Sequence, residues 1–295
     1  MIEPRVVEGS PSTLPMMLRA ALPLRRSGDT LPDLALTLHD VPVDRAHLAS
    51  YAEVCGFPLK ETLPVTYPHL LAFPLHLRIM TDGSFPFPAI GTVHLANSVT
   101  QLRPIAASER LQVTARPDNL RPHAKGRVFD LVTHVHSAGE LVWQETSTFL
   151  RVGRSGLDEP GHPEGRLDRP EEELEQPAPT GTTWRLGADL GRRYAAVSGD
   201  HNPIHLYRLT ARAFGFPRQI AHGMWSKARC LAALDGRLPE AVTVDVAFKK
   251  PLLLPGRVLF ASARRDAGYA FALSRPQDGK PHLLGRFGRF GPATI

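Results

Sequence analysis

Short runs of alternating apolar and polar residues occur in two groups along the chain, and each group follows helix-like segments. They cover residues 91–99, 110–115, 126–136 and 141–151 in the first half, and 241–248, 257–264, 269–274 and 282–290 in the second. A period of two predicts half-buried strands, here of an antiparallel sheet. We expect further strands at 34–38 and around Trp184, with Pro104 and Pro117 acting as breakers.

Helical patterns precede both groups of strands. Residues 42–54 combine a buried stripe with a capping residue, Asp44, and a terminating glycine, Gly56. Residues 68–80 are almost entirely apolar, and their length favours a buried helix that is kinked at Pro74. The remaining helices are expected at residues 14–22, 189–197 and 222–234.

The two halves share a sequence motif as well as an order of elements. YAEVCG at 51–56 matches YAAVSG at 194–199 in its Tyr, Ala, Val and Gly positions. We therefore predict a duplication, with a first unit at 1–152, a linker at 153–182 and a second unit at 183–295. Chance similarity over so short a motif is the alternative. The linker is rich in Pro, Gly and acidic residues, and its central run EEELE is expected to be solvated.

Composition narrows the classes of partner. The net charge of +6 is spread over scattered basic residues, and aromatic residues make up only 7%, so no nucleic-acid partner is expected. The charge suits a substrate that carries phosphates, or else reflects a basic bias without a partner. Two cysteines argue against a disulfide framework or a cysteine zinc site. No signal peptide and no apolar stretch of about 18 residues is present, so we expect a cytoplasmic protein without a membrane span.

The densest chemistry lies between Tyr194 and Met224. Asn202 can cap a helix that begins at Pro203, which places His205 in the first turn. The positive helix end disfavours an imidazolium, so His205 is expected to be neutral, and Asp200 in the preceding loop can face it. An ionised carboxylate and a neutral imidazole form a suitable acid/base pair for one water.

Simpler interpretations remain open at this point. Asp200 can serve only to cap a turn, and His205 can lie on a polar surface. A metal pair lacks a third ligand nearby, because His201 is expected to point elsewhere. Gly223 starts the helix at 222–234 and would let a carbonyl oxygen approach free N–H groups, or would only permit close packing.

This part of the chain resembles a known family. Y-A-x-x-S-G-D-x-N-P-I-H from Tyr194 to His205, A-x-G-F at 213–216 and I-A-H-G-M at 220–224 are similar to the hydratase-2 motif of the MaoC-like (R)-specific enoyl-CoA hydratases. The resemblance covers the second half well and the first half only as a degenerate copy. It implies an α+β fold of the double-hotdog type, in which two antiparallel sheets each wrap around a long central helix.

The resemblance also implies a reaction. Asp200 and His205 would be the catalytic dyad that adds water to a trans-2-enoyl thioester, giving the (R)-3-hydroxyacyl thioester, or catalyses the reverse dehydration. The N–H of Gly223 would bind the thioester oxygen. Asn202 would brace the loop. The substrate would be an acyl-CoA or an acyl-carrier-protein thioester, and neither a metal nor a cofactor other than the coenzyme A of the substrate is expected.

Other implied roles are less direct. Ser198 and His222 would support the dyad. Lys249 and Lys250 are candidates for contacts with the phosphates of coenzyme A, with solvated surface lysines as the alternative. A double hotdog contains its own pseudo-dimer, so a monomer or a homodimer is expected.

The first half has lost the polar positions of the second. The pairs at matching positions are Phe57 and Asp200, Leu59 and Asn202, Thr62 and His205, and Leu70 and Gly223. We expect the first half to be non-catalytic and either to line a tunnel for the acyl chain or to be purely structural. A hotdog thioesterase and a non-catalytic acyl-binding partner are the alternative functions.

Overall fold

The structure is a computed structural model and describes residues 3–9, 13, 15–16, 29–89, 91–153 and 174–290. Most of the predicted helix at 14–22 and most of the predicted linker lie outside these residues. Within them, no helix has both the length and the apolar character needed to cross a membrane.

The described residues of the first half form six strands and two complete helices. These are β1 (Arg5–Val6), β2 (Leu36–Val41), α2 (Arg45–Cys55), α3 (Pro68–Thr81), β3 (Thr92–Gln101), β4 (Leu111–His123), β5 (Gly126–Ser137) and β6 (Glu140–Val152). As predicted, Asp44 caps α2 by accepting from the N–H groups of Ala46 and His47, and Gly56 ends it at a φ of 80°. The helix α3 continues through Pro74.

The second half follows the same order with additions. Its elements are β7 (Thr182–Leu186), α4 (Leu190–Ser198), α5 (Pro203–Leu206), α6 (Arg208–Ala213), α7 (Gly223–Ala232), the 3-10 turn η2 (Asp235–Arg237), β8 (Val242–Phe248), β9 (Gly256–Arg265), β10 (Gly268–Ser274) and β11 (Pro281–Arg289). The short helices α5 and α6 have no counterpart between α2 and α3, where residues 56–67 are non-helical.

All eleven strands belong to one sheet, in the order β1-β2-β4-β5-β6-β3-β8-β11-β10-β9-β7. The expected two sheets are therefore joined, because β3 pairs with β8 in antiparallel register from Ala96 opposite Ala247 to Gln101 opposite Val242. On either side of this seam the strand order is the same if β3 is matched to β8, β6 to β11, β5 to β10, β4 to β9 and β2 to β7. The predicted duplication thus appears as a pseudo-twofold arrangement around the β3–β8 seam, and the double hotdog is built on a continuous sheet.

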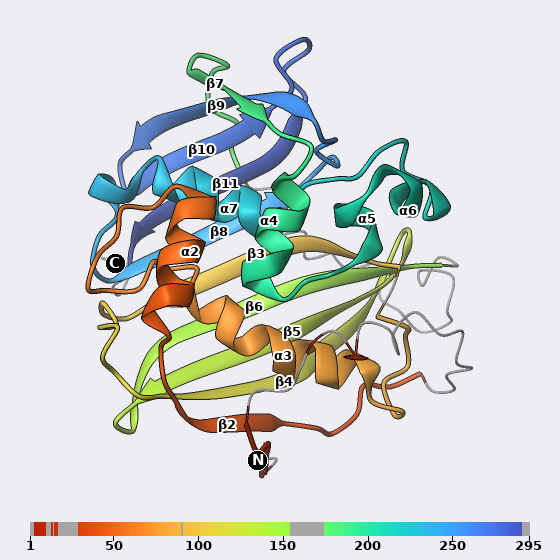
Figure 1. The fold of residues 1–295 in the computed structure, drawn as a ribbon, viewed down its shortest axis with the longest axis vertical. Helices are drawn as coiled ribbons and strands as arrows, with labels where there is room; N and C mark the ends of the chain where they lie inside the picture. The colour runs from red at the N-terminus through yellow and green to blue at the C-terminus, as the bar shows by residue number, and fades with distance from the viewer. Residues whose placement is uncertain are drawn as a thin grey trace.

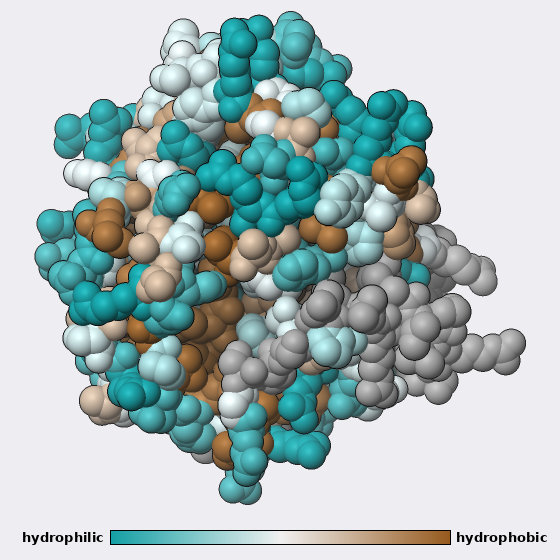
Figure 2. Space-filling view, viewed as in Figure 1, coloured by the Kyte–Doolittle hydropathy of each residue, from teal (hydrophilic) through white to brown (hydrophobic). Residues whose placement is uncertain are grey.

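The helices lie on one side of this sheet (Figure 1). The helix α3 packs on β2, β4 and β5, and α7 packs on β10 and β11. The helices α2 and α4 pack against each other, and the buried rings of Tyr51 and Tyr194 are 6.4 Å apart. These are the two tyrosines of the repeated motif, so the repeat marks the contact between the halves. In Figure 2 apolar side chains gather below α2, over the first-half sheet.

Two expectations about local structure were wrong. Pro117 was expected to break a strand, but it lies inside β4 opposite Leu131. The neighbouring strand β2 pairs with β4 only as far as Ala115, so at Pro117 one edge of β4 is unpaired and the missing N–H costs no ladder bond. The acidic run is not wholly solvated: its Leu174 is buried against Ala247, Ala272 and Leu284, and Glu175 pairs with Arg265.

Candidate active site

The loop between α4 and α5 is held by its own polar groups. The helix α4 ends at Gly199, whose φ of 73° turns the chain towards Asp200. The N–H of Asp200 donates to Ser198 Oγ (3.2 Å), and the N–H of Asn202 donates to Asp200 Oδ1 (3.1 Å). Asn202 in turn caps α5 by accepting from the N–H of Ile204 (3.4 Å). Ser198 and Asn202 therefore fix the backbone that carries the carboxylate.

His205 is buried in the first and only turn of α5. Its Nδ1 lies 2.8 Å from the carbonyl oxygen of Ile220, which can only accept, so Nδ1 carries a proton. Burial lowers the pKa of His205, although the attraction of Asp200 and this carbonyl opposes the shift. The ring is therefore neutral near pH 7, and its Nε2 presents a lone pair that can accept a proton.

Asp200 faces two imidazoles. Burial raises the pKa of its carboxyl group, but the attraction of His222 and His205 outweighs burial, and the net shift is downwards. The Asp200 side chain is 27% exposed, which leaves it open to the cavity. The site thus combines an ionised carboxylate with a neutral base, as the sequence led us to expect.

His222 was predicted only as a supporting residue, and the structure places it against both members of the dyad. Its Nε2 donates to the backbone carbonyl of Asp200 (3.0 Å), and its ring stacks on His205 with centroids 3.7 Å apart. Burial, helped by repulsion from His205, lowers the pKa of His222 to about 3. A neutral His222 holds the loop and the His205 ring in place without adding a competing charge.

The statement that a third metal ligand is missing nearby was wrong. Single ligand atoms of Asp200, His205 and His222 lie within 4.8 Å of one another. Sequence separation hid this, because His222 is brought in by α7. The tautomer argues against a metal here, since the Nε2 of His222 that approaches the Asp200 carboxylate (3.8 Å) carries the proton donated to the Asp200 carbonyl.

Gly223 is the first residue of α7, so its N–H lies at the positive end of a ten-residue helix. Among the described residues no acceptor is recorded for this N–H, and Gly223 lines the same cavity as the dyad. A Cβ added here would lie 3.0 Å from the ring of Phe248. Gly223 therefore satisfies both the oxyanion and the close-packing interpretations.

One cavity of about 410 Å³ brings these residues together. Its lining includes every site residue predicted from the sequence, namely Ser198, Asp200, Asn202, His205, His222, Gly223, Lys249 and Lys250. The two lysines are exposed and adjoin His282, whose Nδ1 donates to the Lys250 carbonyl (3.1 Å). They mark a basic, solvent-facing side of the cavity. His201, by contrast, turns back to the Gly199 carbonyl (3.0 Å) and does not line the cavity.

Sequence reasoning missed part of the lining. The hydroxyl of Tyr194 is buried without a hydrogen-bond partner among the described residues, and its ring is 4.9 Å from that of His222. The first half adds His69, Phe73, His76, Leu77, Met80, His94 and Phe149. The seven-residue spacing of His69 and His76, which puts both on one face of α3, is a signal that could have found two of them.

The chain is similar to known proteins over most of its length. A family model described as "MaoC like domain" matches residues 167–267. A 3-hydroxyacyl-thioester dehydratase X of Mycobacterium tuberculosis is 40% identical over 276 residues, which cover 92% of this chain and 96% of the relative. The crystal structure of HtdX from the same organism superposes with a TM-score of 0.75 at 36% identity, covering 87% of this chain and 100% of that one.

A third comparison concerns the fold alone. A conserved protein of Mycobacterium tuberculosis described as a double hotdog fold superposes with a TM-score of 0.50 at 12% identity, over 84% of this chain and 92% of that one.

Proposed function

The chain belongs to the MaoC-like dehydratase family and is a hydro-lyase, and we propose that it interconverts a trans-2-enoyl thioester and the corresponding (R)-3-hydroxyacyl thioester. The observation that carries this proposal is the juxtaposition of ionised Asp200 with the unprotonated Nε2 of neutral His205 in one cavity. The 3-hydroxyacyl thioester named for the 40% identical relative supports the substrate class.

In the hydration direction the dyad holds one water. The Asp200 carboxylate accepts a hydrogen bond from this water, and that hydrogen stays on the oxygen. His205 Nε2 removes the other hydrogen as a proton while the water oxygen bonds to C3. The protonated ring then returns that proton to C2. Because one imidazole removes and delivers the proton, H and OH add to the same face, and dehydration retraces the same steps.

Negative charge develops on the thioester oxygen as C3 is attacked. The N–H of Gly223 at the start of α7 is the proposed donor to this oxygen. Removing a donor of this kind costs roughly 3–4 kcal/mol of transition-state stabilisation. Tyr194 adds a buried hydroxyl to the same cavity, where it can hold the water or the substrate.

The basic side of the cavity is the proposed binding site for the coenzyme A or carrier-protein end of the substrate. We assign Lys249 and Lys250 to the phosphates of coenzyme A or of a carrier-protein arm, because both are exposed cations on the rim of the cavity. The mechanism uses no metal and no further cofactor. The β3–β8 seam already joins two hotdog units in one chain, which is compatible with a monomer or a homodimer.

The proposal is tested by assaying crotonyl-CoA and longer enoyl-CoAs. Loss of enoyl absorbance without release of free thiol, together with an (R)-configured product, is the expected result. Thiol release at the same rate would instead indicate a thioesterase, and binding without turnover an acyl-binding protein. D200N and H205Q should each lower kcat by about 10²–10⁴.

The matched control is H201Q, a neighbouring imidazole outside the cavity. It should keep the wild-type rate. Unchanged hydration by D200N would remove Asp200 from the mechanism.

A further inference from the structure

The first-half wall of the cavity carries three imidazoles. His69 and His76 lie on one face of α3, and His94 lies on β3. The side chains between them are apolar, as a wall for an alkyl chain requires, among them Phe73, Leu77, Met80 and Phe149. Burying an imidazole costs free energy unless its nitrogens find partners, so a purely hydrocarbon chain gives no reason for three of them.

Of the three imidazoles, His69 is the one held by a carboxylate. Its Nδ1 lies 2.8 and 3.0 Å from the two carboxylate oxygens of Glu145. Burial raises the pKa of Glu145, but attraction to His69 and their hydrogen bond, with smaller help from His76 and Asn97, lower it to about 2. The ionised carboxylate can only accept, so Nδ1 carries a proton, and Nε2 on the other side of the ring is left to bond a further group.

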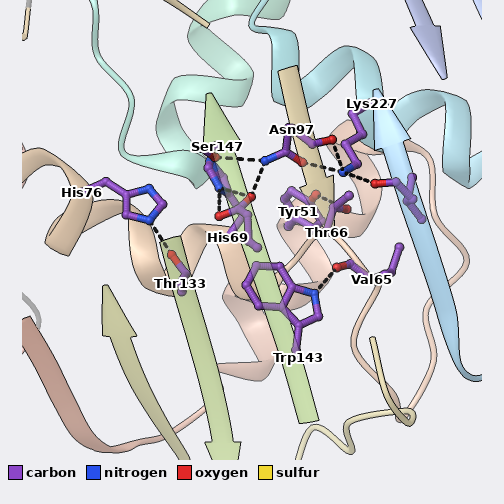
Figure 3. Close-up of polar contacts among 12 residues, drawn as sticks. Tyr51, Val65, Thr66, His69, His76, Asn97, Thr133, Trp143, Ser147 and Lys227 are labelled. Carbon is purple, nitrogen blue, oxygen red and sulfur yellow. Dashed lines mark hydrogen bonds and ion pairs between the residues drawn. The ribbon is translucent and has the colours of Figure 1, made fainter. Parts of the chain in front are cut away.

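Residues of both halves form the hydrogen-bond network that holds the Glu145 carboxylate. Asn97 donates to Glu145 Oε1 (2.6 Å) and to Ser147 Oγ (3.0 Å), and it accepts from Lys227 of α7. Lys227 also donates to the Val244 carbonyl (3.2 Å). Figure 3 shows Asn97 between Ser147 and Lys227, with His69 beside them. This fully buried network supports one imidazole whose remaining nitrogen is not bonded by any described residue.

The other two imidazoles differ from His69 in their hydrogen bonds. His76 Nε2 is already bonded to Thr133 Oγ1 (2.6 Å). His94 stacks on Phe149, with ring centroids 4.4 Å apart, and its buried Nε2 has no partner among the described residues. The wall therefore contains polar groups whose hydrogen-bonding capacity is not fully used, and the Glu145 contacts orient one of them, Nε2 of His69.

We propose that His69, oriented by Glu145, is a subsite for a hydroxyl group on the acyl chain beyond C3, so that hydroxylated acyl thioesters are preferred substrates. The hydroxyl hydrogen-bonds to His69 Nε2 and brings its own hydrogen bond into an otherwise apolar wall. This inference rests on the proposed function for its substrate class. It assigns the first half a role in selecting the chain and not only in enclosing it.

The experiment compares trans-2-enoyl-CoAs of one length, unsubstituted or with a single hydroxyl at each successive carbon from C5 outwards. For at least one position the wild type should show kcat/KM on the order of tenfold above the unsubstituted chain, as one added hydrogen bond can provide. H69F should remove this ratio while retaining hydration of the unsubstituted chain. A wild type without a preference at any position would overturn the proposal.

H76F is the matched control, because it makes the same change on the same helix face at a nitrogen that is already bonded. It should keep the preference. Three outcomes would overturn the assignment to a His69 hydrogen bond. H76F could lose as much of the preference as H69F, H69F could lose kcat/KM equally on both classes of chain, or EDTA could abolish the preference.

Binding separates this inference from the proposed function. Calorimetric Kd values of the wild type for saturated acyl-CoAs with and without the hydroxyl need neither turnover nor a folded variant. The hydroxylated chain should bind on the order of tenfold more tightly. If the protein hydrates crotonyl-CoA but binds both acyl-CoAs with equal Kd, only the subsite is refuted. If the Kd values differ but crotonyl-CoA is not hydrated, only the proposed reaction is refuted.

Discussion

His205 and His222 stack with their ring centroids 3.7 Å apart, and the two rings differ in their hydrogen bonds. His222 donates to the backbone carbonyl of Asp200, while His205 turns its Nδ1 to Ile220 and keeps Nε2 available. One imidazole is thus structural and the other is free for proton transfer. The division depends on both rings being neutral, which burial enforces.

The pH profile of hydration should reflect the neutral state of His205. Its pKa is lowered from the usual 6.5, so the base stays unprotonated when the pH falls through 6.5, and kcat/KM should begin to decline only below that value. Rates measured between pH 4.5 and 8 on crotonyl-CoA provide the test. An acid limb centred above 6.5 would contradict the assignment of His205 as the base.

Acid should destabilise the fold before its carboxylates are protonated. Burial lowers the pKa values of His76, His94 and His222 to about 4, 3 and 3, against 6.5 in the unfolded chain. Depressed imidazole pKa values mean that the unfolded chain binds more protons, so this stability is present above pH 6.5 and is lost as the pH falls towards 3. We expect a loss on the order of a few kcal/mol between pH 6.5 and 5.

Urea unfolding at pH 7.5 and pH 5 measures this loss. H94F should reduce the difference, because it keeps the stack on Phe149 and removes one titrating ring. Equal unfolding midpoints at both pH values would show that these imidazoles are not buried in the neutral form.

G223A should lower both activity and stability. The new Cβ would lie 3.0 Å from the Phe248 ring, which must move, and Phe248 also lines the cavity. The start of α7, which carries the proposed oxyanion donor, would move with it, and a fall of kcat by about tenfold or more is expected. Thermal midpoints and kcat are the measurements.

The double variant G223A/F248L tests whether the clash with the Phe248 ring causes these losses. It relieves the clash and should restore the thermal midpoint together with part of kcat. Full kcat in G223A alone would show that this position tolerates displacement and does not hold the transition state.

K249E/K250E should weaken binding of coenzyme A thioesters. Both lysines are exposed at the cavity, so reversing their charges repels the phosphates without touching the dyad. KM for crotonyl-CoA should rise at low ionic strength and the effect should shrink in salt, while kcat changes little. An N-acetylcysteamine thioester, which has no phosphates, serves as the control, and an equal rise in its KM would refute the assignment.

Chelation should leave hydration unchanged. Two side-chain groups have the composition of metal sites, Asp200 with His205 and His222, and His69 with His76 and Glu145. In the first group Nε2 of His222 already donates to the Asp200 carbonyl, and in the second Nδ1 of His69 and Nε2 of His76 are already bonded to Glu145 and Thr133. Activity after dialysis against EDTA, followed by metal analysis of the protein, is the measurement. A loss that Zn²⁺ reverses would contradict the metal-free mechanism.

Much of the local structure was accessible from patterns in the chain. The helices around 45–55 and 68–81 and the strand sets of both halves follow from apolar periodicity and from caps such as Asp44 and Gly56. Pro117 shows the limit of such patterns, because a proline is tolerated where a neighbouring strand happens to have ended. The motif residues of the second half were also recognisable, since they are close in sequence.

The chain by itself determined the duplicated order of elements and the placement of Asp200 and His205 around one helix start, because both depend on local backbone preferences. Only the tertiary structure joined the two sheets at β3 and β8, stacked His222 on His205, and brought His69, held by Glu145, to the cavity. These contacts link residues far apart in sequence, and only the folded chain supplies the burial that lowers the pKa values of His205 and His222. The first half is a degenerate copy in its sequence, and in the structure it supplies one wall of the cavity that holds Asp200 and His205.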